Sequence, residues 1–308
     1  MEFRFQSDNL NAYKSNMGCV PTRQFMKRKT ILVQKSTGRP SPKRIYDVSS
    51  LDDYISISLL GTGKYSEVIK SLYRPHNEYR ALKIISKEHC SRFCVNELIL
   101  NQSLNHPNIL KSYEMLEDRN NFYISSFYCE GGNLAKRAKT QRFSEAQIGE
   151  IIFQVLSGIA HCHQNKIIHR DLKLENILLE KNESLSLKIA DFGLACLIGD
   201  KDAEGVCGTP VYMAPEIFSN SYNEKIDMWS TGVVLFFLAK NQFPLKCKKH
   251  EKRARPDFST LNLNVPTAEI LNEELEDLIQ GLLEIDPEKR LSAKEALNSS
   301  WLKSSTSH

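Results

Sequence analysis

Two short stretches decide the fold: HRDLKLEN at residues 169–176 and DFG at residues 191–193. The first brings together three side chains of different chemistry, Asp171, Lys173 and Asn176. The second follows an apolar run, Leu185 to Ala190, that is predicted to be a β-strand. We expect the loop and the end of this strand to supply the parts of a single site.

These groups match the needs of phosphoryl transfer. That chemistry requires a carboxylate that orients the acceptor, ligands for metal ions, and cations that balance the charge on the phosphoryl oxygens. Asp171 is predicted to accept the proton of the acceptor hydroxyl, and Lys173 to neutralise the γ-phosphate. Asn176 and Asp191 are predicted to hold magnesium ions.

A glycine-rich loop, GTGKYSEV at residues 61–68, lies between two predicted strands. Glycines let the backbone approach phosphate oxygens, and free N–H groups there can donate to them. Taken alone, such a loop is more often only a hairpin turn. Ser66 also stands where a third glycine is expected.

Lys83 lies in an apolar strand, where alternation should turn its side chain inward. A lysine in that position is costly without an anionic partner. Glu97, in a predicted helix at residues 93–104, is the expected partner, and the pair would hold the α- and β-phosphates. For these two residues alone, a surface ion pair is the alternative interpretation.

The order of the predicted elements indicates an α+β fold. β-Branched and aromatic runs, which favour strands of an antiparallel sheet, occur at residues 54–60, 79–85 and 122–124. Beyond Gly132, apolar residues recur three and four apart, which is typical of helices. These helices are predicted at residues 144–165, 226–239 and 273–283. Strands first and helices afterwards imply two lobes.

Further motifs appear in order along the chain: HPNI at 106–109, GTP at 208–210, APE at 214–216, DMWSTG at 227–232, and DP at 286–287 followed by Arg290. With these motifs, the chain resembles the eukaryotic protein kinase family over residues 54–302. The resemblance implies an N-lobe at residues 54–128, with an antiparallel sheet and one main helix. It implies a mostly helical C-lobe at residues 129–302 and a short tail at residues 303–308.

The resemblance also implies the function and the site. It implies an ATP-dependent serine/threonine protein kinase, a signalling transferase that uses Mg²⁺ and acts on protein substrates. Serine/threonine specificity is implied by Lys173 and Thr209. The implied catalytic residues are Lys83, Glu97, Asp171, Lys173 and Asn176. The implied nucleotide contacts are Leu60, Gly61, Thr62, Gly63, Val68, Ala81, Lys83, Ser126, Tyr128, Cys129, Glu130 and Leu178.

Within the family, YCEGG at 128–132 and LSAKEAL at 291–297 look most similar to calcium/calmodulin-dependent and calcium-dependent kinases. The glycine loop also resembles that of casein kinase two. The run at residues 200–205 begins like an EF-hand calcium loop, but its twelfth position is Val211 rather than glutamate. A kinase domain without EF-hands is therefore expected. Family members also pair Glu216 with Arg290, and use Asp227 to support the catalytic loop.

Residues 194–208 contain no Ser, Thr or Tyr, so the usual phosphorylation site of this segment is absent. Kinases with Arg beside the catalytic Asp generally need an anion on that arginine, here Arg170. Asp200, Asp202 or Glu204 could supply this anion permanently, which predicts a loop that is ordered without phosphorylation. The alternative is a merely solvated acidic loop.

Two further departures concern the binding surfaces. Asn101, Ser112 and Ser126 stand where apolar residues usually lie behind the nucleotide, which predicts a roomy, partly hydrated back pocket. Asn133 and Phe237 stand at positions that are often acidic in similar kinases, whereas Glu175 is kept. A preference for arginine upstream of the acceptor is therefore not expected.

Residues 1–50 carry ten Lys and Arg against three Asp and Glu and lack periodicity, so they are predicted to form a disordered basic arm. If translation starts at Met17, Gly18 fits a myristoylation signal with Cys19 beside it for palmitoylation. The basic residues would then add contacts to an anionic membrane surface. A nucleic-acid partner is not expected, since the arm lacks interleaved aromatics.

The eight cysteines are scattered without a CxxC pair, which favours free thiols. No apolar stretch is long enough for a membrane-spanning helix, and the N-terminus lacks the layout of a secretory signal. A cytoplasmic monomer is expected. The rival class is a pseudokinase-like scaffold that binds ATP without turnover, motivated by Asn101, Ser112 and Ser66.

Overall fold

A computed structural model of the chain describes residues 50–63, 66–88, 100, 103–199, 203–219, 221–245, 256–263 and 272–305. Several predictions fall outside these residues: the arm up to residue 49 with Gly18 and Cys19, most of the helix at 93–104 with Glu97 and Asn101, and both Asp200 and Asp202. Ser50, predicted to belong to the arm, instead caps a 3₁₀ helix, η1 (Leu51–Asp53), because its hydroxyl accepts from the Asp52 amide.

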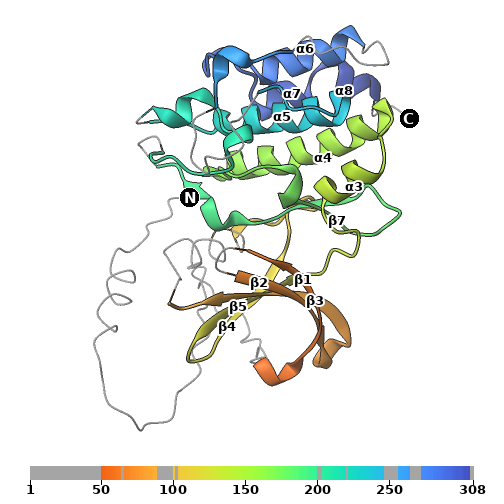
Figure 1. The fold of residues 1–308 in the computed structure, drawn as a ribbon, viewed down its shortest axis with the longest axis vertical. Helices are drawn as coiled ribbons and strands as arrows, with labels where there is room; N and C mark the ends of the chain where they lie inside the picture. Colours follow the sequence, from red (N-terminus) through yellow and green to blue (C-terminus); the bar gives the residue numbers. More distant parts are fainter. Residues whose placement is uncertain are drawn as a thin grey trace, which may run out of the picture. The chain divides into compact units, whose positions relative to one another are not determined.

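The N-terminal part is a five-stranded antiparallel sheet with the strand order β1-β2-β3-β5-β4 (Figure 1). Its strands are β1 (Tyr54–Thr62), β2 (Ser66–Tyr73), β3 (Glu78–Ser86), β4 (Ser112–Glu117) and β5 (Asn121–Phe127). A short 3₁₀ helix, η2 (Arg74–His76), and Asn77 in the left-handed conformation connect β2 to β3. The predicted strands are confirmed, although each extends beyond its predicted ends.

The register of the sheet places the predicted nucleotide contacts on one face. Val68 pairs with Lys83, Lys83 with Ile124, and Ala81 with Ser126. Directly paired residues share a face, and residues two apart along a strand do so as well. Strand β3 continues for three residues past Lys83, so Lys83 lies within the strand.

The opposite face of this sheet is held by a polar cluster around Arg80. The Arg80 guanidinium lies 3.7 Å from the ring centroid of Tyr73 and 4.3 Å from that of Tyr113. It also forms an ion pair of 3.3 Å with Glu114, whose carboxylate accepts from the Tyr54 hydroxyl at 2.6 Å. Buried charge requires such partners, and this cluster links four of the five strands.

The C-terminal part is helical. Its helices are α3 (Leu134–Thr140), α4 (Glu145–Gln164), α5 (Lys225–Lys240), α6 (Glu273–Leu282), α7 (Ala293–Leu297) and α8 (Ser300–Ser305). Helix α4 begins at a capping box in which Ser144 and Gln147 exchange hydrogen bonds, which matches its predicted start. The first residues of the predicted tail, from residue 303, belong to α8. The predicted α+β kinase fold is confirmed.

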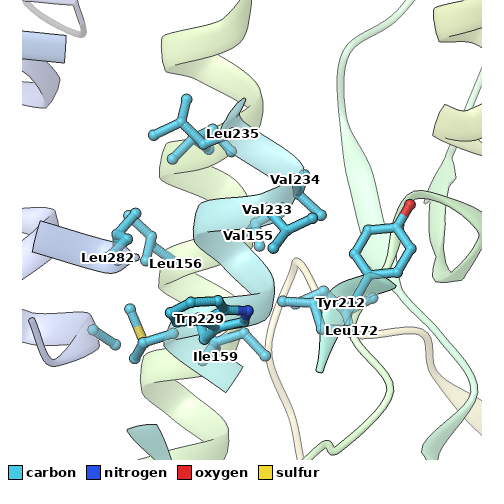
Figure 2. Close-up of a cluster of buried hydrophobic side chains, with 14 of the residues drawn as sticks. Val155, Leu156, Ile159, Leu172, Tyr212, Trp229, Val233, Val234, Leu235 and Leu282 are labelled. Carbon is cyan, nitrogen blue, oxygen red and sulfur yellow. The ribbon is translucent and has the colours of Figure 1, made fainter. Parts of the chain in front are cut away.

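Helix α5 is the centre of the helical core. Most of its residues are buried, because it is apolar on all sides and packs against both α4 and α6. Figure 2 shows Trp229, Val233, Val234 and Leu235 of this helix together with residues of its neighbours. The residues from neighbouring helices are Val155, Leu156 and Ile159 of α4 and Leu282 of α6. Since the same helix carries Asp227, the core fixes a residue of the site.

Two short strand pairs frame the catalytic loop. Strand β6 (Ile167–Ile168) pairs with β9 (Cys196–Leu197), and β7 (Ile177–Leu179) pairs with β8 (Leu187–Ile189). The predicted strand at 185–190 is thus β8 with shorter ends. Residues 169–176 lie between β6 and β7, and Asp191 follows β8. This pairing brings the two decisive stretches together.

The predicted ion pair between Glu216 and Arg290 is confirmed. Both Nη atoms of Arg290 donate to the Glu216 carboxylate, one of them at 3.0 Å, and the Arg290 side chain is fully buried. Glu216 lies in η6 (Pro215–Phe218), far from Arg290 in the sequence.

None of the helices in the described part of the chain combines the length and the apolar composition that a membrane span requires.

Candidate active site

Asp171, Lys173 and Thr209 form a closed triangle. The Lys173 ammonium lies 2.6 Å from Asp171 Oδ2 and donates to the Thr209 hydroxyl at 2.9 Å. That hydroxyl donates to Asp171 Oδ1 at 2.8 Å. Asn176 adds a bond from Nδ2 to the Asp171 carbonyl oxygen at 2.9 Å. The predicted acceptor-orienting carboxylate therefore has a cation and a hydroxyl directly against it.

Close backbone packing brings Thr209 to this triangle. The preceding Gly208 has φ of 109°, and a Cβ atom there would lie 2.6 Å from the carbonyl oxygen of Arg170. Any other residue would push the two segments apart. Glycine at this position therefore lets a residue 38 positions away in the chain reach the catalytic aspartate.

Asp227 holds the loop from within the core. It is completely buried, and its carboxylate accepts the backbone N–H groups of His169 and Arg170, each at 2.9 Å. Arg170 has φ of 68°, a conformation that non-glycine residues rarely adopt and that surrounding contacts must maintain. Although burial opposes ionisation, the hydrogen bonds from His163 and His169 lower the pKa of Asp227. The predicted supporting role is confirmed.

Lys83 contacts Asp191 across the two parts of the chain. Its Nζ lies 2.9 Å from Asp191 Oδ1. Burial opposes ionisation of Asp191, but the charge of Lys83 lowers its pKa below the ordinary value. The Asp191 backbone is left-handed, with φ of 65°, at the start of η4 (Phe192–Leu194). The predicted partner Glu97 lies outside the described residues.

Asn176 and Asp191 offer oxygen donors that suit Mg²⁺. Because Asn176 Nδ2 is bound to Asp171, its amide oxygen remains to serve as a ligand. The described residues contain no group of three or more Asp, Glu, His or Cys side chains able to hold a metal. Mg²⁺ usually binds through one or two carboxylates plus substrate phosphates rather than in an all-protein cage. The donor set therefore fits a metal carried with a nucleotide.

The glycine loop lies over the nucleotide face of the sheet. Gly61 has open space around it, and the Gly63 amide donates to the Ser66 carbonyl at 2.7 Å, which closes the hairpin between β1 and β2. Leu60, at the end of the loop, is exposed, as are Gly61, Thr62 and Gly63. The Gly63 amide is thus already used within the hairpin, and the binding of phosphate oxygens by this loop stays a prediction.

The connection from β5 to α3 carries three more of the predicted nucleotide contacts, Tyr128, Cys129 and Glu130. Cys129 is buried, and burial raises the pKa of its thiol to about 12, so it stays protonated. Glu130 N donates to the Glu180 carbonyl at 2.9 Å, and Leu178 is half-buried on β7. The Tyr128 ring lies near Lys70 and Tyr79, at the outer end of the nucleotide face.

Two of the three polar residues predicted to lie behind the nucleotide, Ser112 and Ser126, belong to the described residues. Ser126 is almost fully buried, and its hydroxyl donates to the Ala81 carbonyl at 3.4 Å. Ser112 lies directly opposite Ser126 in the β4–β5 register. Asn101, the third residue of this prediction, lies outside the described residues. A small side chain at position 126 is thus satisfied by the backbone of its neighbouring strand.

Arg170 is held by neutral oxygen atoms. It donates to the carbonyl oxygens of Leu194 at 2.6 Å and Glu204 at 3.3 Å, and to the Tyr222 hydroxyl at 3.2 Å. Tyr222 donates in turn to the Gly205 carbonyl at 2.7 Å. The prediction of a docked carboxylate is wrong for Glu204, which reaches Arg170 through its backbone. Asp200 and Asp202 lie outside the described residues.

Sequence reasoning missed one exposed side chain near the acceptor site. Phe243 follows α5, and its ring packs against Phe237 and Tyr212. An aromatic residue after a helix is usually assigned to the core, and no motif marks Phe243. Its 38% exposure is a tertiary property that the sequence pattern does not contain.

Comparisons with known proteins agree with this geometry. The family model described as the protein kinase domain matches residues 54–302. Calcium-dependent protein kinase 4 of Plasmodium falciparum is 36% identical over 83% of this chain and 50% of its own length. CBL-interacting protein kinase 26 of Oryza sativa is 33% identical over 83% of this chain and 53% of its own. Serine/threonine-protein kinase DCLK3 of Mus musculus is 32% identical over 87% of this chain and 35% of its own length.

The chain belongs to the protein kinase family. Its relatives by sequence are serine/threonine kinases, and they include calcium-dependent protein kinases as the resemblance implied. The chain spans about half the length of the first curated relatives that it matches.

Proposed function

We propose that the chain transfers the γ-phosphoryl group of ATP to serine or threonine hydroxyls of proteins. The observation that carries this proposal is the triangle of Asp171, Lys173 and Thr209, together with the ion pair of Lys83 and Asp191. The charge of Lys173 also acts on Asp191, so the triangle and the ion pair belong to one site. This site holds a carboxylate suited to accept a hydroxyl proton, and two ammonium groups suited to phosphate oxygens.

The proposed role of each side chain follows from its charge. The Thr209 hydroxyl already donates to Asp171 Oδ1, so this oxygen is oriented to accept a hydrogen bond from an acceptor hydroxyl. Lys173 lies against the same carboxylate and balances negative charge on the transferred group. Lys83 would contact the other phosphates. Mg²⁺, held by Asn176 and Asp191, would neutralise phosphate oxygens and align them.

Serine/threonine rather than tyrosine specificity is supported by the tight closure of the triangle. The Thr209 hydroxyl lies 2.9 Å from Lys173 Nζ and 2.8 Å from Asp171 Oδ1. An acceptor hydroxyl that is to reach Asp171 must therefore come close to the backbone of this loop. A short side chain meets that demand. One of the relatives named above, DCLK3 of Mus musculus, is a serine/threonine-protein kinase by name.

The test is transfer of radiolabelled phosphate from ATP and Mg²⁺ to a serine/threonine peptide library. We expect incorporation by the purified full chain and its loss by about 10²- to 10⁴-fold in Asp171→Asn, the usual contribution of a catalytic base. Equal incorporation by both proteins would assign the activity to a contaminant. No incorporation by either protein would favour the ATP-binding scaffold.

We also propose peripheral membrane attachment if translation starts at Met17. Gly18 would then be N-terminal, and the basic residues that follow would add attraction to anionic lipid. Mass spectrometry of the native N-terminus tests this, since an unmodified N-terminus at Met1 contradicts it.

A further inference from the structure

Three aromatic side chains, Tyr212, Phe237 and Phe243, form what we call the aromatic cluster. The ring centroids of Tyr212 and Phe243 lie 5.6 Å apart at an interplanar angle of 87°. Those of Phe237 and Phe243 lie 4.8 Å apart. Tyr212 is only 4% exposed, whereas Phe243 is 38% exposed. The cluster therefore has a buried base and an open apolar surface.

This cluster is fixed relative to the acceptor site. Tyr212 ends the 3₁₀ helix η5 (Pro210–Tyr212), and its amide donates to the Thr209 carbonyl at 2.9 Å. Its own carbonyl accepts from the Ser230 hydroxyl of α5 at 2.8 Å. Figure 2 shows the Tyr212 ring at the edge of the buried cluster, with its hydroxyl turned away from Trp229. One short turn thus joins the cluster to the hydroxyl that contacts Asp171.

The surroundings of the cluster are less acidic than similar kinases would suggest. Phe237 replaces a residue that is often acidic, and Asn133 replaces another. The Asn133 side chain accepts from the Lys136 amide at 2.9 Å and caps α3, so it serves the helix. Glu175 remains exposed, and its carboxylate lies near the Tyr212 hydroxyl. Burial, together with this carboxylate, raises the pKa of Tyr212.

We propose that the open surface of the aromatic cluster binds an apolar side chain of the protein substrate. This inference rests on the proposed function and names the substrate class for the same site. Only the short turn η5 separates Thr209 from Tyr212, and an extended peptide advances about 3.3–3.6 Å per residue, so the apolar residue is expected within a few residues of the acceptor. Continuity with Thr209 favours a substrate segment over other occupants, because a peptide held at Asp171 passes within reach of the cluster.

The physical reason is burial of apolar area. A leucine, methionine or phenylalanine placed on Phe243 removes apolar surface of both side chains from water, and ring contacts favour edge or offset geometry. An arginine at the same place would find no acidic side chain within the cluster itself, since the neighbouring carboxylate, Glu175, lies at the Tyr212 hydroxyl. The aromatic cluster therefore selects for apolar residues where an acidic pair would select for basic ones.

A positional peptide library tests this proposal on the full chain with ATP and Mg²⁺. Each library fixes serine or threonine at the centre and varies one flanking position through all residue types. We expect one flanking position at which Leu, Met, Ile or Phe raises kcat/KM by about tenfold over Ala or Gly. Phe243→Ala should reduce that preference to about twofold or less without changing KM for ATP. Phe243→Glu should shift the preference to Arg or Lys.

Phe153→Ala is the matched control, because Phe153 is 42% exposed on α4 and is not part of the aromatic cluster. It should keep the wild-type preference. Phosphate transfer without any apolar preference, or a preference that survives in Phe243→Ala, would overturn this inference alone. Absence of transfer to every peptide would instead overturn the proposed function, and this inference with it.

Discussion

At the scale of single residues, the site depends on side chains whose partners are set by backbone geometry. Asp227 contacts no substrate group in our assignment, yet it binds two consecutive N–H groups of the catalytic loop. Arg170, held in a left-handed conformation, depends on that carboxylate. The direction of the pKa shift of Asp227 allows a test of this dependence.

The first prediction concerns Asp227 and pH. Because its folded-state pKa is lowered, ionised Asp227 stabilises the fold above the unfolded value of about 3.9, and this stabilisation is lost as pH falls through the folded pKa. Asp227→Asn should lower the free energy of unfolding at pH 7 by about 1–3 kcal/mol, since one loop N–H loses its acceptor. Urea unfolding at pH 7 and at a series of pH values well below about 3.9 measures both effects. A difference between the two proteins that does not shrink at low pH contradicts the prediction.

The second prediction concerns Ser126. Its side chain is small and is bonded to the Ala81 carbonyl, so no bulky group stands at this position of the nucleotide face. ATP analogues enlarged on the adenine amine should therefore be accepted, and Ser126→Met should reduce their use at least about tenfold while keeping use of ATP. Competition assays with such analogues measure this. Ser126→Ala, which adds no bulk, serves as the control, and equal use of analogues by all three proteins would refute the idea.

At the scale of elements, Arg170 connects η4 to the described residues after β9 through neutral acceptors. It donates to the Leu194 carbonyl in η4, and beyond β9 to the Glu204 carbonyl and the Tyr222 hydroxyl. Hydrogen bonds from a charged donor are stronger than neutral ones, so these contacts stabilise the described part of the segment without a phosphate.

The third prediction follows from this arrangement. Phosphatase treatment of bacterially expressed protein should leave its activity unchanged, since residues 194–208 contain no acceptor and Arg170 already has partners. Tyr222→Phe removes one of these partners and should lower the free energy of unfolding by about 1 kcal/mol, with a measurable drop in activity. Total loss of activity after phosphatase treatment would count against this account.

At the scale of the whole molecule, one ion pair joins distant parts of the helical core. Arg290 is fully buried and binds both oxygens of Glu216, which belongs to the segment that also carries Thr209. Its guanidinium further donates to the Glu284 carbonyl at 2.8 Å and the Lys225 carbonyl at 3.0 Å. Removing one member of such a network leaves buried polar groups without partners.

The fourth prediction is that Arg290→Ala lowers the free energy of unfolding by about 3–5 kcal/mol, because Glu216 is left as an uncompensated charge. Glu216→Gln should cost less, since the amide keeps one acceptor for the guanidinium. Chemical denaturation followed by tryptophan fluorescence measures both variants, because Trp229 lies 5.1 Å from the Arg290 guanidinium. If Glu216→Gln proved the more damaging change, the assignment would be wrong.

The motifs alone determined the family and the fold class, and they predicted the catalytic groups that the proposed function uses. Asp171, Lys173 and Asn176 are close in the chain, and the local chemistry of such short stretches can be read without a fold. Strands and helices with clear periodicity, such as β3 and α4, were predicted with small errors at their ends. Those ends depend on pairing partners and on caps, as at Ser50 and Ser144.

The family motifs also predicted some distant pairs, such as Glu216 with Arg290, but only the tertiary structure decided the contacts that no motif specifies. Thr209 reaches Asp171 because Gly208 allows a close approach, and Arg170 binds the carbonyl of Glu204 rather than its carboxylate. Phe243 stays exposed beside Tyr212 for the same kind of reason. Sequence fixes the chemistry of each side chain, but packing of the core sets its direction and its neighbours, and neither follows from spacing along the chain.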